Sequence, residues 1–360
     1  ICTVESSRHF SEQRNEKMKR LKVAIVGATG AVGQKFVEIL ARHPWFEVAH
    51  LAASERSEGE IYGEVCRWQQ ASAMPATLAA MRVGNVSPRE NLDLAFSALS
   101  ASVAEEIELS WAASGVPVFS NARNHRMAPD VPLVIPEVNA DHLALVRKQS
   151  TTRGFSPRGF IVTNPNCSTT FLAMALAPLE RAFGLRNVSV VTLQAISGAG
   201  YPGLPSMDIL GNVIPNIAGE ESKMEEETRK ILGQIQDGAI QMAGLTVSAQ
   251  VNRVPVLDGH VESVSFSLAR SAMLNEILDV LSAFRGEPQE LNLPSAPLNP
   301  IVVTEEEDRP QPRLDLYGDN AMSTLVGRVR PCPVLDYKMT VLGHNTIRGA
   351  AGGSAVSYTH

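Results

Sequence analysis

The chain has 360 residues, of which 44% are hydrophobic and 19% are charged, and its formal net charge is -6. This length predicts about two globular domains, and the mild negative charge argues against a nucleic-acid partner, which would need a basic patch. No apolar run approaches the roughly 20 residues that cross a bilayer, so we expect no membrane insertion.

The first 17 residues are polar and contain no apolar stretch of the kind found in secretory signals. We expect residues 1–17 to form an extension outside the fold, disordered or loosely attached. The four cysteines, Cys2, Cys66, Cys167 and Cys332, are far apart and form no CxxC pair. This spacing supports neither a zinc site nor a disulfide framework, and isolated thiols favour a reducing, cytoplasmic location.

The first half of the chain alternates predicted strands and helices. Residues 21–28 are an apolar run that predicts a buried parallel strand, residues 31–42 have helical periodicity, and a second strand is expected at 48–53. Further strands are predicted at 92–98, 116–120, 133–136 and 160–163, with helices at 101–114 and 139–149 and a surface loop at 147–160. This alternation predicts an α/β fold, with a doubly wound, Rossmann-type domain at residues 18–166.

The second half begins with a predicted helix at 168–183 and continues with long strands. The strands are expected at 187–196, 247–256, 260–269, 323–330 and 337–342, with a charged helix at 221–233 and a loop at 287–300. Polar and apolar residues alternate within these strands, which is typical of a sheet with one exposed or interfacial face. We therefore predict an α+β domain at residues 167–343, built on a mixed or antiparallel sheet.

A glycine-rich loop follows the first predicted strand and opens the first helix. Its sequence, GATGAVG, fits GxxGxxG through Gly27, Gly30 and Gly33, with Thr29, Ala31 and Val32 between them. Glycines at these positions permit a tight turn and close approach of the backbone to a pyrophosphate, and the helix N-terminus adds positive potential. The loop predicts a dinucleotide site; its alternative is a purely structural turn.

The residues after the second strand bear on the choice of dinucleotide. Arg56 and Ser57 could hold the 2′-phosphate of NADP, because arginine forms paired, charge-assisted bonds to phosphate. Glu55 is instead the kind of residue that binds the ribose 2′-hydroxyl of NAD. The chemistry favours NADP, with NAD as the alternative.

Cys167 lies between an apolar strand and an apolar helix, in the sequence NPNCST at 164–169. Free N–H groups and the dipole at a helix N-terminus stabilise a thiolate, so we predict a nucleophile whose pKa lies below that of a free cysteine. The alternative is a buried structural cysteine.

Motifs further along the chain give a family resemblance. NPNCST is followed by QAISGAG at 194–200, GEESK at 219–223, RVPVLDGH at 253–260 and HNTIRGAAG at 344–352. In this order, behind GATGAVG, they resemble aspartate-β-semialdehyde dehydrogenase over residues 21–352, in wording closest to its archaeal and fungal branch. The resemblance implies reduction of 4-aspartyl phosphate to aspartate 4-semialdehyde with NADPH, in the biosynthesis of lysine, threonine and methionine.

The resemblance also implies residue roles and an assembly. Cys167 would form an acyl-thioester, His260 would be the acid/base catalyst, which suits a side chain that titrates near neutrality, and Gln194 would orient the substrate. The further implied roles are substrate binding by Arg253 and Glu220, phosphate binding by Arg126 and Lys223, and contacts to the nicotinamide end of NADP by Ser197, Gly198 and Asn345. No metal is implied. Residues 344–360 would return to the first domain, and the protein would form a homodimer or homotetramer through the sheet of the second.

Two alternatives stay open. Malonyl-CoA reductase has a related layout but would need room for coenzyme A and no partner for an amino group, so Glu220 favours the aspartyl substrate. A non-catalytic NADP-binding protein of the same fold would be expected to have lost catalytic residues, whereas Cys167, Gln194, Arg253 and His260 are all present.

Overall fold

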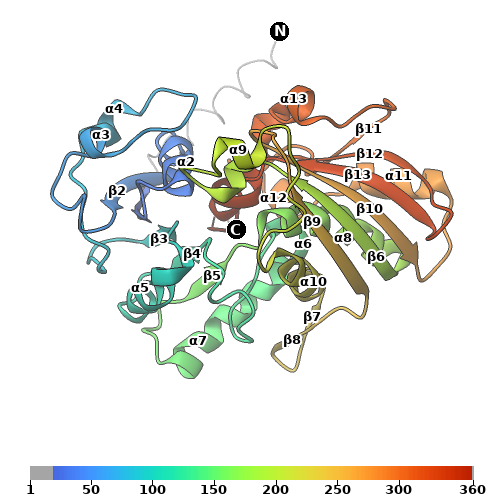
Figure 1. Ribbon diagram of the computed structural model, residues 1–360. Helices are drawn as coiled ribbons and strands as arrows, with labels where there is room; N and C mark the ends of the chain where they lie inside the picture. Colours follow the sequence, from blue (N-terminus) through green and yellow to red (C-terminus); the bar gives the residue numbers. More distant parts are fainter. Residues whose placement is uncertain (1–18, 359–360) are drawn as a thin grey trace, which may run out of the picture.

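Two β-sheets stand side by side in the computed structural model, which describes residues 19–358 (Figure 1). The predicted extension at 1–17 lies outside the described residues. The first sheet is wholly parallel, in the order β2-β1-β3-β4-β5. Its strands are β1 (Leu21–Val26), β2 (Phe46–Ala52), β3 (Leu94–Ser97), β4 (Val118–Ser120) and β5 (Ile161–Thr163).

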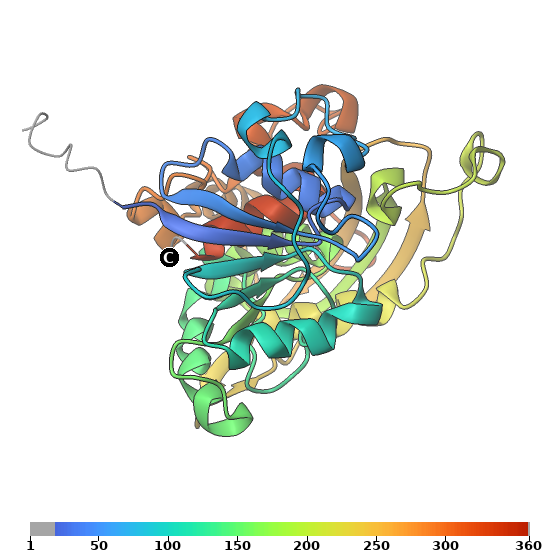
Figure 2. The same ribbon diagram turned by 90° about the vertical axis from the view of Figure 1, so that its left-hand side faces the viewer.

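Helices cover both faces of this sheet because its strands are apolar on both sides (Figure 2). In β1, Val23 and Ile25 pack in the same cluster as residues of α2 (Ala31–Leu40), whereas Ala24 and Val26 pack in the cluster of α5 (Ala101–Ala113). The arrangement places the start of α2, and with it the glycine-rich loop, at the carboxyl end of β1.

The second sheet is mixed and has the order β11-β12-β13-β10-β6-β9. β10 is antiparallel to β6 and β13, while the pairs β6–β9 and β11–β12 are parallel. Its strands are β6 (Leu185–Gln194), β9 (Thr246–Arg253), β10 (His260–Leu268), β11 (Ile301–Thr304), β12 (Thr324–Pro331) and β13 (Tyr337–Gly343). The predicted α/β class, with a parallel sheet and a second, mixed sheet, is confirmed.

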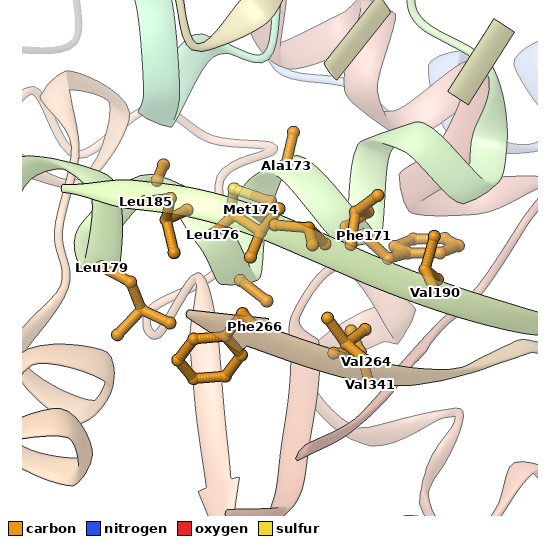
Figure 3. Packing of buried hydrophobic residues seen from close by; sticks show 14 of the residues in the cluster. Phe171, Ala173, Met174, Leu176, Leu179, Leu185, Val190, Val264, Phe266 and Val341 are labelled. Atoms are coloured by element: carbon orange, nitrogen blue, oxygen red, sulfur yellow. The ribbon is translucent and has the colours of Figure 1, made fainter. Parts of the chain in front are cut away.

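One long helix, α8 (Cys167–Phe183), forms the core of the second half (Figure 3). Phe171 and Met174 belong to the same buried cluster as Val190, Val264 and Phe266 of the sheet. Alternate residues of β10 are buried while those between them are more exposed, so one face of the sheet packs on α8 and the other is open.

The remaining elements are short or peripheral. The helices are α3 (Tyr62–Val65), α4 (Ala76–Ala79), α6 (Pro136–Asn139), α7 (Val146–Arg153), α9 (Ser206–Ile209), α10 (Glu220–Ile231), α11 (Leu274–Ala283), α12 (Glu287–Glu290), α13 (Pro312–Asp315) and α14 (Gly352–Tyr358); β7 (Gln234–Gln236) and β8 (Ala239–Gln241) form a hairpin. Each helix of residues 19–358 falls short of the length and apolar character needed to cross a bilayer.

Three predicted elements are wrong; one is the loop at 287–300, whose first residues, Glu287–Glu290, form α12. Residues 133–136 make a single bridge, from Leu133 to Thr163, and Pro136 then begins α6, because a proline has no N–H to continue a ladder. The predicted loop at 147–160 is helical as far as Arg153, where Gly154 ends α7 with a φ of 68°. The Arg153 guanidinium holds that helix end on Asp130 at 2.6 Å.

The last described segment runs back between the sheets. A π-helical turn at Ile347–Ala351 leads into α14, and the turn lies against both α2 and α8. Arg348 donates to both carboxylate oxygens of Glu137, at 3.0 and 2.5 Å, and both side chains are buried. The amide of Asn164, beside β5, donates to the Ala350 carbonyl at 2.8 Å.

Candidate active site

Cys167 is the first residue of α8, at the turn that follows β5. Asn166 caps the helix, because its Oδ1 accepts hydrogen bonds from the backbone N–H groups of Ser168 (3.0 Å) and Thr169 (3.4 Å). The Sγ atom of Cys167 lies 3.2 Å from Nε2 of His260, the first residue of β10. Residues 93 positions apart in the sequence thus form one thiol–imidazole pair.

The backbone fixes the tautomer of His260. The N–H of Ala195 donates to Nδ1 of the ring at 3.1 Å, so the neutral imidazole carries its hydrogen on Nε2, facing Cys167. Burial, together with the positive charge of Arg253, lowers the pKa of His260 to about 3. His260 is therefore a neutral hydrogen-bond donor toward the sulfur.

The predicted low pKa of Cys167 is wrong for the chain as described. Burial raises the pKa of the thiol to about 12, and the negative charge of Glu220 adds to the rise. Arg126, the Ser168 N–H and Arg253 act in the opposite direction without offsetting it. The helix N-terminus is in place, but the desolvation of the sulfur outweighs its effect.

Arg253 and Gln194 are two further buried side chains predicted to belong to the site of the Cys167–His260 pair. Arg253 is buried and donates from Nη1 to the Ala195 carbonyl at 2.7 Å, and Gln194 is buried beside Thr192, with 3.4 Å between its Nε2 and the hydroxyl. A Cβ at Gly198 would stand 2.7 Å from Nη1 of Arg253 and 3.1 Å from the His260 ring. A side chain at residue 198 would therefore displace the Arg253 guanidinium.

Asn166 also links the remaining predicted residues through two glutamates of α10. Its side-chain amide donates to Glu220 at 2.6 Å, and Glu220 pairs with Lys223 at 2.7 Å. Its backbone N–H donates to Glu227 at 2.7 Å, and Glu227 pairs with Arg126 at 3.0 Å. Arg126 and Lys223 are thus each connected to Asn166 by one intervening carboxylate.

Sequence reasoning missed Glu227 and the linking role of Asn166. Glu227 stands in the run Glu225–Glu227, which looks like a solvated helix face. It lies three residues after Met224 and four before Ile231, both buried, so its helical spacing to an apolar stripe was the available signal.

A cavity of about 310 Å³ joins Cys167 to the glycine-rich loop. Its wall includes Ala31, Val32, Arg126, Asn166, Cys167, Ser197, Gly198 and Asn345. Gln194, Glu220, Lys223, Arg253 and His260 are not part of this wall. On the far side of the cavity, Asn345 donates to the Ser197 hydroxyl at 2.8 Å and accepts from the Gly259 N–H at 2.9 Å.

The glycine-rich loop makes a tight turn in which two glycines lie directly on neighbouring backbone. Gly27 has a φ of 88°, and a Cβ there would lie 2.7 Å from the Ala98 carbonyl; a Cβ at Gly33 would lie 2.1 Å from the Gly27 carbonyl. Within the described residues no side chain caps the start of α2, so its first-turn amides are available to an anion. Thr29 uses its carbonyl to hold Gln34 at 2.9 Å.

Arg56 and Ser57 lie in the turn after β2, where the sequence argument expects the ribose. Arg56 and Glu55 are exposed and Ser57 is partly exposed. Both the arginine and its acidic neighbour are therefore accessible to a ligand.

Comparison with known proteins gives matches over nearly the whole chain. Residues 22–146 match the family described as semialdehyde dehydrogenase, NAD binding domain, and residues 176–348 match semialdehyde dehydrogenase, dimerisation domain. Aspartate-semialdehyde dehydrogenase from Methanothermobacter thermautotrophicus is 46% identical, over 94% of this chain and 97% of its own length. The enzyme of that name from Schizosaccharomyces pombe is 44% identical over 93% and 96%.

Solved structures agree. Aspartate semialdehyde dehydrogenase with NADP from Candida albicans has a TM-score of 0.88 and 41% identity, covering 95% of this chain and 98% of that one. Aspartate semialdehyde dehydrogenase II complexed with ASA from Vibrio cholerae has a TM-score of 0.75 at 27% identity, over 95% and 98%. The likeness extends over both sheets.

Proposed function

Because the chain belongs to the aspartate-semialdehyde dehydrogenase family, we propose that it converts 4-aspartyl phosphate to aspartate 4-semialdehyde with NADPH. The observation that carries the proposal is the Cys167–His260 pair, 3.2 Å apart, with Cys167 on the wall of a cavity that reaches the glycine-rich loop. A nucleophile, a proton-bearing ring and a dinucleotide loop then share one site.

Cys167 is the nucleophile in this scheme. Its sulfur forms the C–S bond as the bond from the acyl carbon to phosphate breaks, and the thiol proton leaves with the phosphate. His260 is a poor base for that proton, because its Nε2 already carries hydrogen. It instead donates to the sulfur and to the oxyanion of the acyl intermediate.

NADPH, when bound, supplies the hydride that reduces the thioester. The amides at the start of α2 suit the pyrophosphate, Ser197, Gly198 and Asn345 suit the nicotinamide end, and Arg56 and Ser57 suit the 2′-phosphate. The oxyanion of the resulting thiohemiacetal then re-forms the carbonyl group. The C–S bond breaks, the aldehyde leaves, and the sulfur takes a proton from solvent.

Substrate binding uses charged groups that already have partners. We propose that Arg253 binds the α-carboxylate, Glu220 the amino group, Gln194 the acyl part, and Arg126 with Lys223 the phosphate. The Nε of Arg126 is a buried donor without a partner in the described part of the chain, which supports an anion beside it. Arg253 must exchange its bond to the Ala195 carbonyl for the substrate.

The division into a cofactor-binding part (18–166 with 344–360) and a catalytic part (167–343) is also our proposal. The open face of the second sheet, which includes the exposed Leu193, suits the subunit contact of a homodimer or homotetramer. Cytoplasmic location and a role in making aspartate-family amino acids follow the same proposal.

The deciding experiment is NADP⁺ reduction with aspartate semialdehyde, in the presence and absence of phosphate. We expect phosphate-dependent reduction, and no comparable oxidation of NADPH with malonyl-CoA. The reverse pattern would favour malonyl-CoA reductase, and inactivity with both substrates, despite NADP binding, would indicate a non-catalytic protein.

A further inference from the structure

A buried carboxylate on α10 connects two parts of the site that come from distant segments. Glu227 is only 2% exposed. Its Oε1 accepts from Nη1 of Arg126 at 3.0 Å, and its Oε2 accepts from the backbone N–H of Asn166 at 2.7 Å. The second bond holds the residue immediately before Cys167.

One turn further along the helix, Lys230 holds the same loop by its backbone. Lys230 is 2% exposed, and its Nζ donates to the carbonyls of Arg126 (2.6 Å), Ala128 (2.8 Å) and Val131 (2.9 Å). Glu227 and Lys230 together fix both the guanidinium and the main chain of Arg126. Each buried charge is compensated by hydrogen bonds, as burial requires.

The helix that carries them is itself anchored to the second sheet. Glu221 and Glu225 accept from the backbone N–H groups of Val251 (3.2 Å) and Ala249 (3.0 Å) on β9, the edge strand of the second sheet, beside which α10 lies (Figure 1). Through α10, the position of the Arg126 loop is therefore set by the second sheet and not only by the first.

We propose that Glu227 is a positioning residue that holds phosphate-binding Arg126 and the Asn166–Cys167 turn in one geometry. The proposal rests on the function proposed above for Arg126 and Cys167. Glu227 touches neither substrate nor cofactor, so it acts through its two partners. Its effect is to hold the Arg126 guanidinium, which binds the departing phosphate, at a fixed position relative to the Cys167 sulfur that displaces the phosphate.

The chemistry of the two contacts requires a carboxylate. Both partners are N–H donors, so both atoms at the end of residue 227 must accept. Glutamine offers one oxygen and one NH₂ group, which would leave two donors facing each other at one of the contacts. Aspartate keeps both acceptors but is shorter by one methylene.

The test compares Glu227→Gln with Glu226→Gln, the same substitution at the exposed neighbouring residue of the same helix. For Glu227→Gln we expect the KM for phosphate to rise roughly 10–100-fold, the usual size for losing a hydrogen bond to a charged group. The Kd for NADP⁺ should stay within about twofold and Tm should remain close to that of Glu226→Gln. Glu227→Asp should recover part of the phosphate effect.

A second readout does not depend on turnover. Iodoacetamide labelling of Cys167, followed by peptide mass spectrometry, measures how inorganic phosphate alters access to the sulfur. In Glu227→Gln the phosphate concentration for half effect should rise in parallel with the kinetic KM. If the unaltered enzyme shows no phosphate-dependent reduction, the proposed function fails, while this labelling comparison still tests Glu227.

Two results would overturn the proposal. One is a phosphate KM and a labelling response in Glu227→Gln equal to those of Glu226→Gln. The other is an equal loss in Tm, NADP⁺ binding and every kinetic constant, without recovery in Glu227→Asp, which would make Glu227 a purely structural residue.

Discussion

At the scale of single residues, the site combines groups whose protonation states are set by burial. The pKa of Cys167 is raised to about 12 and that of His260 is lowered to about 3, so a neutral thiol and a neutral imidazole face each other across the physiological range. The sequence shows both residues and the helix start, but the desolvation that reverses the predicted thiol pKa depends on how tightly distant segments close over the sulfur.

The raised thiol pKa predicts the pH dependence of alkylation. Below its pKa a thiol is ionised about tenfold more for each pH unit, so the labelling rate of Cys167 should climb steadily from pH 6 to pH 10. Labelling of the free enzyme with iodoacetamide, with the peptide identified by mass spectrometry, measures this. A plateau reached between pH 6 and 8 would restore the low pKa predicted from the sequence.

Substitutions of Cys167 and His260 should have different effects on turnover and on alkylation of the thiol. Cys167→Ala should abolish turnover and the covalent acyl-enzyme, because the thioester needs sulfur, and Cys167→Ser should retain only a trace. His260→Gln keeps a polar side chain, so Cys167 should remain alkylable, while kcat falls roughly 10²–10³-fold because the oxyanion loses a well-placed donor. Substantial activity in Cys167→Ala, or a trapped adduct on Cys66 or Cys332, would refute the assignment.

Glu262 predicts a stability effect outside the chemistry. It is fully buried on β10, and neither carboxylate oxygen has a partner within the described residues, so burial raises its pKa well above the usual 4.5. The folded state prefers the protonated acid; stability is therefore full below pH 4.5 and falls as the pH rises towards the folded pKa. Glu262→Gln should raise stability near pH 8 by at least about 1 kcal/mol and have little effect near pH 4.

Thermal unfolding at both pH values measures the difference, with the exposed Glu226→Gln as the control for removing one charge. Equal gains at the two pH values would mean that Glu262 is not the group that titrates.

At the scale of elements, the sequence predicted those helices, strands and turns whose conformation depends on residues close together in the chain. The apolar run of β1, the turn at Gly27 and the polar start of α8 were all predicted because their causes lie within a few residues. Strand 133–136 failed because Pro132 and Pro136, at its two ends, remove ladder donors from an otherwise apolar run. Glu227 was missed because a run of three glutamates looks like a solvated helix face, although its spacing to Met224 and Ile231 places it on the buried side.

The glycine-rich loop predicts a contrast between two equal substitutions. A Cβ at Gly33 meets the Gly27 carbonyl at 2.1 Å, so Gly33→Ala must push α2 away from β1 and should cost about 1–3 kcal/mol as well as NADP⁺ affinity. At Gly30 the nearest atom is 3.4 Å away and φ is -75°, so Gly30→Ala should keep Tm while weakening NADP⁺ binding. Calorimetry and cofactor titration of both variants would separate the effects, and an equal Tm in the two would contradict the packing argument.

At the scale of the whole molecule, the two sheets are held together by the returning segment. Arg348 and Glu137 are buried and bonded at 3.0 and 2.5 Å, so Arg348→Met leaves an unpaired buried carboxylate and should cost about 3–5 kcal/mol. Adding Glu137→Gln should restore much of that loss, because it removes the charge that was left behind. Denaturant titration of the single and double variants checks this, and additive losses would argue against a coupled pair.

The pairing of Glu137 with Arg348 also bears on the order in which the nascent chain can fold. Glu137 is made 211 residues before the arginine that neutralises it, and Ala351 and Ala355, which complete the cluster around β1, follow that arginine in the chain. A chain that stops before Arg348 therefore lacks the partner of Glu137 and two residues of the cluster around β1. Packing of the first half is therefore complete only after residues 348–355 have been added, and until then its apolar surface is open to aggregation.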